Sequence, residues 1–276
     1  MLEANRVIDR RAFLADLGHG VVAIALVSIA GCTPSVIGSP SPRATSPSSA
    51  GPGATPSSGP GGSAGASPPS ASSPAASGGS GDGVAWERVN LGFVSAYLLV
   101  RGGEAALVDT GVGGSEGAIE AALGGIGLGW DALAHLILTH HHGDHQGSAG
   151  AVLTNAPQAV VYAGAEDAAR ITVDPVTTVG DGETVFDLQI VTTPGHTPGS
   201  ISVLDPVGGV LVVGDAMGTA DGRPTLPGAQ FSDDMAVATQ SIVKLGGLIF
   251  EALFVGHGDP IEAGASGLVA ALGAAG

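Results

Sequence analysis

Short apolar runs, each ended by a glycine or another turn residue, make up most of the chain from residue 96 onward. Runs of this length are typical of β-strands and too short for most helices. They are "AYLLV" (96–100), "AALVD" (105–109), "ALAHLIL" (132–138), "AVVY" (159–162), "LQIVTT" (188–193), "SISVLD" (200–205), "GVLVVGD" (209–215) and "EALFVG" (251–256). Few of them alternate apolar and polar residues, so we expect strands that are buried on both faces.

Helical segments are expected between these strands. The sequence predicts helices at 115–123, 147–153, 165–171, 233–245 and 265–272. The third and fourth begin with acidic residues, which stabilise the N-terminus of a helix. The segment "RGGE" (101–104) predicts a hairpin between the first two strands. This order of elements favours a layered α/β sandwich over a simple doubly wound sheet.

The composition changes sharply before this region. Residues 33–83 are nearly all Ser, Pro, Gly, Ala and Thr, and Arg43 is their only charge before Asp82. Such a segment has too little apolar surface to offset the entropy of ordering, so we predict a disordered linker. The remaining residues, 84–276, suit one domain with a single sizeable core.

The first 32 residues resemble an export signal. The pair Arg10-Arg11 precedes "VVAIALVSIA" (21–30), which is too short to span a bilayer but typical of the core of a signal peptide. The pair resembles a twin-arginine signal; an ordinary Sec signal and a transmembrane anchor are the alternatives. The ending "IAGC" (29–32) resembles a lipobox, in which Cys32 is acylated. We therefore expect an extracytoplasmic lipoprotein that contacts the membrane through its lipid anchor only.

Cys32 and the charge balance exclude several classes of function. Cys32 is the only cysteine, so disulfides and cysteine-ligated metals are excluded. The whole chain has nine basic and twenty-five acidic residues. An acidic surface repels phosphate backbones, so we expect a small-molecule substrate and no nucleic acid. The sequence does not fix the oligomeric state.

The segment "THHHGDHQG" (139–147) contains four of the eight histidines of the chain. His140, His142, Asp144 and His145 are candidate ligands, because imidazole suits Zn²⁺ and a carboxylate also suits Fe or Mn. On an extended backbone His140 and His142 project to the same side, and Gly143 permits a turn towards a second ion. Taken alone, the segment could also be an exposed turn that binds metal adventitiously.

Three later segments place similar residues after predicted strands. His196 lies in "TTPGHTPGS" (192–200), Asp215 in "VVGDAM" (212–217) and His257 in "FVGHGDP" (254–260). Each alone is a weak signal, since Gly-Asp and Gly-His-Gly are common in turns and loops. Together, at strand ends and in this order, they indicate a metal site built from distant parts of the chain.

With "LVDTG" (107–111), these segments resemble the five-motif signature of the metallo-β-lactamase-fold hydrolases, over about residues 89–262. The resemblance implies a four-layer αββα sandwich. It implies one metal ion held by His140, His142 and His196, and a second held by Asp144, His145 and His257. Asp215 would bridge the two ions, and Asp109 would be the buried aspartate that orients the ligand loops.

The activity implied is hydrolysis with two metal ions, which we expect to be Zn²⁺, with Fe or Mn as alternatives. Two ions that share a water lower its pKa, and the resulting hydroxide attacks a carbonyl carbon. Asp144 would steer this water or accept its proton. The expected substrate has an ester-like bond, in a thioester, a lactone or a β-lactam. Asp215 stands where metallo-β-lactamases carry Cys or Ser, which favours the glyoxalase II-like and lactonase-like branch.

Two other functions stay open at this point: a persulfide-dioxygenase-like oxidoreductase with one iron, and a non-catalytic metal-binding lipoprotein. Two histidines are not expected to bind metal. His141 is expected to face solvent or the substrate, and His135 to lie in the core. The pocket walls are expected in loops 90–96, 163–178 and 217–231, with Tyr97, Met217, Phe231 and Arg223 as candidates.

Overall fold

The computed structural model describes residues 85–276. The predicted signal peptide (1–32), its lipidation site Cys32 and the predicted linker (33–83) lie outside the described residues. In the described part, no helix is both long enough and apolar enough to cross a membrane.

The first sheet has six strands, which follow one another in sequence order. They are β1 (Ala85–Asn90), β2 (Ser95–Arg101), β3 (Glu104–Val108), β4 (Leu133–Ile137), β5 (Val160–Gly164) and β6 (Val176–Val179). β1, β2 and β3 pair antiparallel, which confirms the predicted hairpin between β2 and β3. β3 to β6 pair in parallel through helical crossovers.

The second sheet has five strands in the order β13-β10-β9-β8-β7. They are β7 (Thr184–Val185), β8 (Leu188–Thr192), β9 (Ile201–Asp205), β10 (Val210–Val212) and β13 (Ala252–Phe254). β13 pairs with β10 in parallel, and the other pairs are antiparallel. A separate ribbon joins β11 (Gly218–Ala220) to β12 (Arg223–Thr225).

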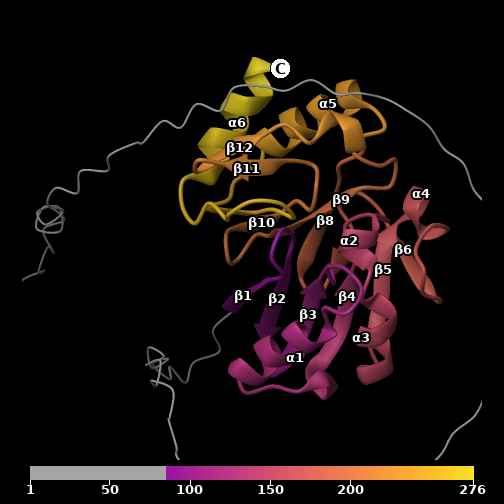
Figure 1. Cartoon of the computed structure of the whole chain (residues 1–276). Coiled ribbons are helices and arrows are strands. Elements are labelled where there is room, and N and C mark those ends of the chain that lie inside the picture. Colours follow the sequence, from indigo (N-terminus) through magenta and orange to yellow (C-terminus); the bar gives the residue numbers. More distant parts are fainter. Residues whose placement is uncertain (1–84) are drawn as a thin grey trace, which may run out of the picture. The chain divides into compact units, whose positions relative to one another are not determined.

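Helices cover the outer face of each sheet (Figure 1). The helices on the side of the first sheet are α1 (Glu116–Gly125), η1 (Trp130–Ala132), α2 (Gly143–Gln146), α3 (Ala149–Asn155) and α4 (Ala165–Ala168). Those that follow the second sheet's central strands are η2 (Ala229–Phe231), α5 (Met235–Gly246) and α6 (Ala265–Ala275). α5 begins where its acidic N-cap predicts, because the Asp234 side chain accepts hydrogen bonds from the backbone N–H groups of Ala236 and Val237.

Strand β2 shows why the apolar runs lack alternation. Tyr97 and Leu99 pack between the two sheets, against residues such as Ile190 of β8. Leu98, on the opposite face of β2, packs in the outer layer with Ile119 of α1. The second sheet is covered in the same way by α5 and α6. Each central strand is thus buried on both faces, and the predicted αββα sandwich is confirmed.

Five strands were absent from the predicted set: β1, β6, β7, β11 and β12. All five are edge strands of their sheets or form the separate ribbon. Edge strands are half exposed and mix polar with apolar residues, as in "AWERVN" of β1 and "VTTV" of β6. Their hydrophobic pattern is therefore too weak to distinguish them from loops.

Candidate metal centre

The strands that precede the His and Asp motifs end at one edge of the sandwich. β3 and β4 are parallel, and β8, β10 and β13 share one direction in the other sheet. Two backbone bonds join the sheets at this edge: Ile201 N–H donates to Thr139 O (2.9 Å), and Ser95 N–H donates to Gly256 O (2.9 Å). The carboxyl ends of both sets of strands therefore deliver their loops to one place.

His140, His142 and His196 form the first cluster, and their ligand atoms lie within 4.8 Å of one another. His142 Nδ1 and His196 Nε2 are 2.9 Å apart. His140 Nε2 is buried and has no hydrogen-bond partner. An unpartnered buried polar atom is costly, and a metal ion between the three nitrogens would satisfy it.

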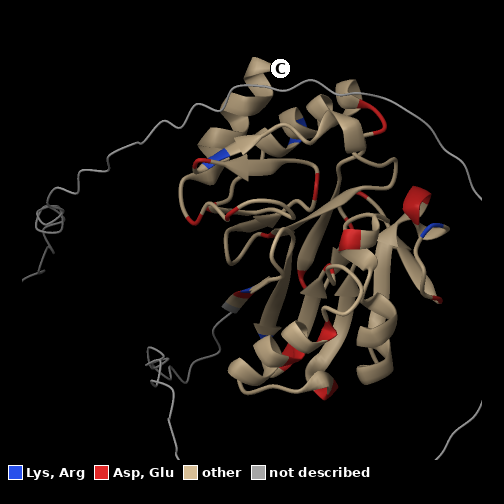
Figure 2. Ribbon diagram, viewed as in Figure 1, with Lys and Arg blue, Asp and Glu red and all other residues tan. Residues whose placement is uncertain are grey.

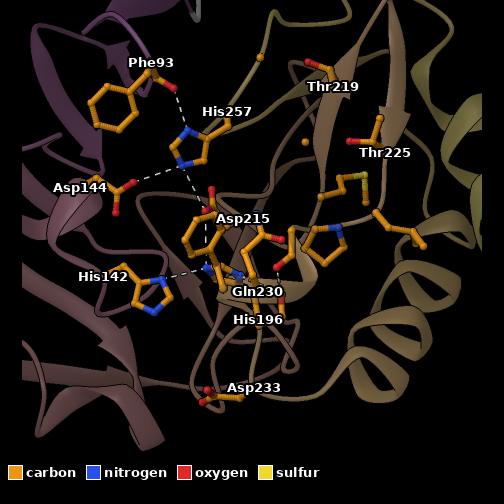
Figure 3. A pocket seen from close by; sticks show the side chains of 18 of the residues that line it. Phe93, His142, Asp144, His196, Asp215, Thr219, Thr225, Gln230, Asp233 and His257 are labelled. Atoms are coloured by element: carbon orange, nitrogen blue, oxygen red, sulfur yellow. Dashed lines mark hydrogen bonds and ion pairs between the residues drawn. The ribbon is translucent and has the colours of Figure 1, made fainter. Parts of the chain in front are cut away.

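Asp144, His145 and His257 form the second cluster, also within 4.8 Å. His257 Nε2 lies 3.3 Å from Asp144 Oδ2, and Figure 3 shows both side chains at the cavity. The other nitrogen of His257 is already engaged, because Nδ1–H donates to Phe93 O at 2.7 Å. This bond leaves Nε2 as the free ligand atom.

Asp215 lies between the two clusters. Its Oδ2 is 3.5 Å from His196 Nε2 and 3.3 Å from His257 Nε2 (Figure 3). Its Oδ1 is 3.2 Å from His145 Nε2, yet neither atom has the geometry of a hydrogen bond. A carboxylate in reach of both clusters can contact two ions at once. The donor set of imidazoles and carboxylates, with these orphaned atoms, fits a pair of divalent ions.

Burial keeps two of the histidines neutral. It holds the pKa of His140 well below its usual range, with the neighbouring His145 adding to the effect. Burial likewise lowers the pKa of His196 to about 4, although Asp215 opposes the shift. Imidazole binds metals in its neutral form, so both rings are in the ligating form at neutral pH.

Carboxylates have the opposite effect on two other cluster histidines. Hydrogen bonds to Asp144 and Asp215 raise the pKa of His257 to about 10. Burial opposes charge on His145, but Asp109 and Asp215 outweigh it and raise the pKa of that ring to about 10. The hydrogen bond from His257 lowers the pKa of Asp144. Burial disfavours the charge of Asp215, yet His145 and the other histidines hold its pKa well below its usual range. The ligand carboxylates are therefore ionised.

A sequence profile described as the Metallo-beta-lactamase superfamily matches residues 89–257, which include all seven candidate ligands and both sheets except the start of β1. The chain belongs to the metallo-β-lactamase superfamily. The solved structure of TTHA1623 in a di-iron-bound form is similar to it, with 26% identity and a TM-score of 0.52. That similarity covers 63% of this chain and 91% of the solved one.

Curated relatives match parts of the domain. The uncharacterized protein YobT of Bacillus subtilis is 33% identical over 45% of this chain and 61% of its own length. A hydroxyacylglutathione hydrolase of Anaeromyxobacter dehalogenans is 40% identical over 44% of this chain and 45% of its own length. The chain thus spans less than two thirds of these relatives.

Asp109, in the segment 107–111, fixes the ring orientation of two candidate ligands through buried hydrogen bonds. Its Oδ2 accepts hydrogen bonds from Thr139 Oγ1 and from His145 Nδ1–H, both at 2.8 Å. Because Thr139 Oγ1 donates to Asp109, it can accept from His140 Nδ1–H at 3.1 Å. In both rings Nδ1 is engaged, so Nε2 is the atom left for a ligand, and on His145 an ion would displace a proton from it. Asp109 itself has a left-handed backbone (φ 62°), a strained conformation that such networks maintain.

His141 is in neither ligand cluster, but the prediction that it faces solvent or the substrate is wrong, since it is only 6% exposed and does not line the cavity. The backbone bends at residues 139–141, and the His141 ring packs edge-on against the ring of His142, with 4.8 Å between ring centroids. Its Nδ1 lies 2.9 Å from Oδ2 of the buried Asp167. His135 lies in a strand away from the centre, as predicted, but it is partly exposed and not a core residue, with partners in Glu104 and Tyr162.

Asp167 in α4 is a residue that sequence reasoning missed. Its carboxylate accepts from His141 N–H (2.9 Å), Thr197 Oγ1 (2.7 Å) and Gly199 N–H (2.9 Å). It therefore ties the loop of His140 and His142 to the loop of His196. The acidic start of this segment looked like ordinary helix capping, and only the buried contacts distinguish Asp167 from it.

Two glycines are required by close approach in these loops. Gly195 has φ 128°, and a Cβ there would collide with the backbone of Ala238. A Cβ at Gly256 would collide with Asp215 Oδ1 and His145 Cε1, inside the candidate centre. The Gly-His pattern at both positions thus has a steric cause.

The cavity beside the clusters has a volume of about 950 Å³. Of the predicted wall loops, 90–96 and 217–231 contribute to it and 163–178 does not. Met217 and Phe231 line it as expected. Tyr97 does not, because it is buried between the sheets and donates its O–H to Val255 O at 2.8 Å. Arg223 also lies outside the lining.

Proposed function

We propose that this chain is a metal-dependent hydrolase that cleaves an ester-like bond with two divalent ions, preferably zinc. The observation that carries the proposal is the placement of Asp215 between two three-ligand clusters. When bound, such ions supply an activated water and polarise the carbonyl of the substrate. His140, His142 and His196 would hold one ion, and Asp144, His145 and His257 the other.

The protein's own groups have distinct roles in this proposal. The centre opens into the cavity, which is lined by His142, Asp144, His196, Asp215 and His257, so a substrate carbonyl in the cavity would lie beside it. Asp144 is ionised and partly exposed, and its second oxygen can orient a water and accept its proton. His140 and His145 are fully buried, so they would bind the ions from the side of the protein interior.

The test combines metal quantification with turnover on a panel of a thioester, a lactone and a cephalosporin. We expect two ions per wild-type chain and hydrolysis of at least one substrate. His196→Ala and Asp215→Ala should each lose metal and reduce kcat/KM by more than about 100-fold. Unchanged metal content and turnover in both variants would contradict the proposal. One iron per chain with thiol-dependent oxygen uptake would instead indicate the oxidoreductase, and full occupancy without turnover a non-catalytic metal-binding protein.

We also propose that the protein is exported and attached to the membrane by a lipid on Cys32. The support is the Arg pair, the apolar run and the lipobox-like ending in the first 32 residues. Wild type should partition into detergent on phase separation, and Cys32→Ser should move to the aqueous phase. Equal partitioning of both would contradict this proposal.

A further inference from the structure

The cavity extends well beyond the candidate metal ligands. From the clusters it continues past residues 217–219, which follow β10. It then passes residues 225–228, the short helix η2 and Asp233. Figure 3 shows Thr219 and Thr225 together on one side of this space and Asp233 on another. Its volume of about 950 Å³ lies in the usual range for small-molecule sites. A substrate can therefore place a large group outside the centre.

Exposed apolar side chains gather at this cavity. Phe93 is 63% exposed, Leu226 43% and Phe231 65%, and all three line it. Phe93 comes from the β1–β2 loop, and the other two come from the segment before α5. The Phe93 ring also stacks on His257, with 5.9 Å between ring centroids and 8° between planes. Exposed hydrophobic side chains that converge on a cavity typically contact an apolar ligand.

Among the described residues, no lysine or arginine lines this cavity. Basic residues are few throughout the described range 85–276 (Figure 2), and three of them are held in ion pairs with carboxylates. Arg88 pairs with Asp259 at 3.1 Å, Arg101 with Asp205 at 2.9 Å and Lys244 with Asp181 at 2.5 Å. Apart from the candidate ligands, the charged residue at the cavity is Asp233. A carboxylate in this outer part would find no cation and would meet like charge.

We propose that the substrate carries an uncharged, apolar acyl chain in this outer cavity, seated on Phe93, Leu226 and Phe231, and no carboxylate there. The inference rests on the proposed function, since it takes the cluster edge as the site of bond cleavage. The expected substrates are neutral acyl esters or lactones of medium length. Anionic thioesters and other substrates with a distal carboxylate are disfavoured.

The test uses two esters that differ in one charge. The full metal-loaded chain is assayed with p-nitrophenyl octanoate and with the mono-p-nitrophenyl ester of suberic acid, which has the same acyl length and a terminal carboxylate. We expect kcat/KM to be at least about tenfold higher for the octanoate than for the suberate, and also higher than for p-nitrophenyl acetate. Equal or faster cleavage of the suberate would overturn the inference.

Two variants assign the effect to the cavity. Phe231→Ser should lower the octanoate-to-acetate ratio of kcat/KM by about tenfold, because the chain loses its apolar contact. Ile249→Ser is the matched control, since Ile249 is 92% exposed and lies outside the cavity. It should leave the ratio unchanged. Gln230→Arg should improve the suberate relative to the octanoate; an unchanged preference in both cavity variants would contradict the inference.

A binding measurement separates this inference from the proposed function. N-phenyl-1-naphthylamine is neutral, and 1-anilinonaphthalene-8-sulfonate is a closely similar anion. We expect the full chain to bind the neutral dye more tightly, and Phe231→Ser to weaken that binding. If no ester is cleaved but this pattern holds, the hydrolase proposal fails and the apolar site stands. If the anionic dye binds as tightly, the inference fails whatever the turnover.

Discussion

The two sides of the cavity are built differently. The ligand side consists of the seven candidate ligands with Asp109 and Asp167, and most of these side chains are buried and have fixed partners. The wall side is the segment 217–233, where Leu226, Phe231 and Asp233 are exposed. One side fixes geometry in advance, and the other offers an apolar surface with few constraints on each residue.

This difference separates chemistry from specificity. Ligands must be held within a fraction of an ångström, so their supporting carboxylates and glycines leave little freedom for substitution. The wall needs only a suitable shape, polarity and charge, so it can change without disturbing the centre. Substitutions on the ligand side should therefore affect metal binding and stability, and those on the wall should affect substrate choice.

Removal of the metal should give the largest change in the stability of the fold. Ions bound at a thousand times their Kd stabilise the folded state by about 4 kcal/mol each, so a chelator should lower the melting temperature markedly. Differential scanning calorimetry with and without chelator measures this, and added Zn²⁺ should reverse it. Asp215→Ala, which lacks the shared ligand, should respond much less. An equal response in this variant would place the metal elsewhere.

Asp109→Asn should have the next largest effect. The amide cannot accept from Thr139 Oγ1, Thr139 N–H and His145 Nδ1–H together, while Asn still tolerates the left-handed backbone. Loss of such a partner typically lowers metal affinity by about 10- to 100-fold. Chelator competition measures the affinity, and Asp221→Asn, at an exposed left-handed position, is the matched control. Unchanged affinity would show that Asp109 does not orient the ligands.

The same division explains what the sequence could predict. The candidate ligands are residue types with specific chemistry after strongly apolar strands, so these residues and the αββα layers follow from pattern and resemblance. Asp167 was missed because its role depends on two loops that meet only in three dimensions. The wall was only partly predicted, because exposed loop residues such as Leu226 carry no periodic signal.

Asp167→Asn should have a smaller effect than Asp109→Asn, because Asp167 contacts the ligand loops and not the rings of the candidate ligands. An amide satisfies only some of the donors from His141, Thr197 and Gly199, and one buried donor left unpaired costs about 1–3 kcal/mol. We expect that loss in the free energy of unfolding together with weaker binding of the ion at His140, His142 and His196. A purely structural role would reduce stability and leave metal affinity unchanged, which chelator competition distinguishes.

Leu226→Ala on the wall should have the smallest effect on stability. Its side chain is already exposed, so truncation removes little buried area and should change the free energy of unfolding by less than about 0.5 kcal/mol. The same substitution at Leu138, which is fully buried directly before the first ligand loop, should cost about 2–5 kcal/mol. Urea denaturation measures both. Comparable losses would mean that the wall is held as tightly as the ligand side, because an exposed leucine can cost that much only where its segment is packed against the rest of the domain.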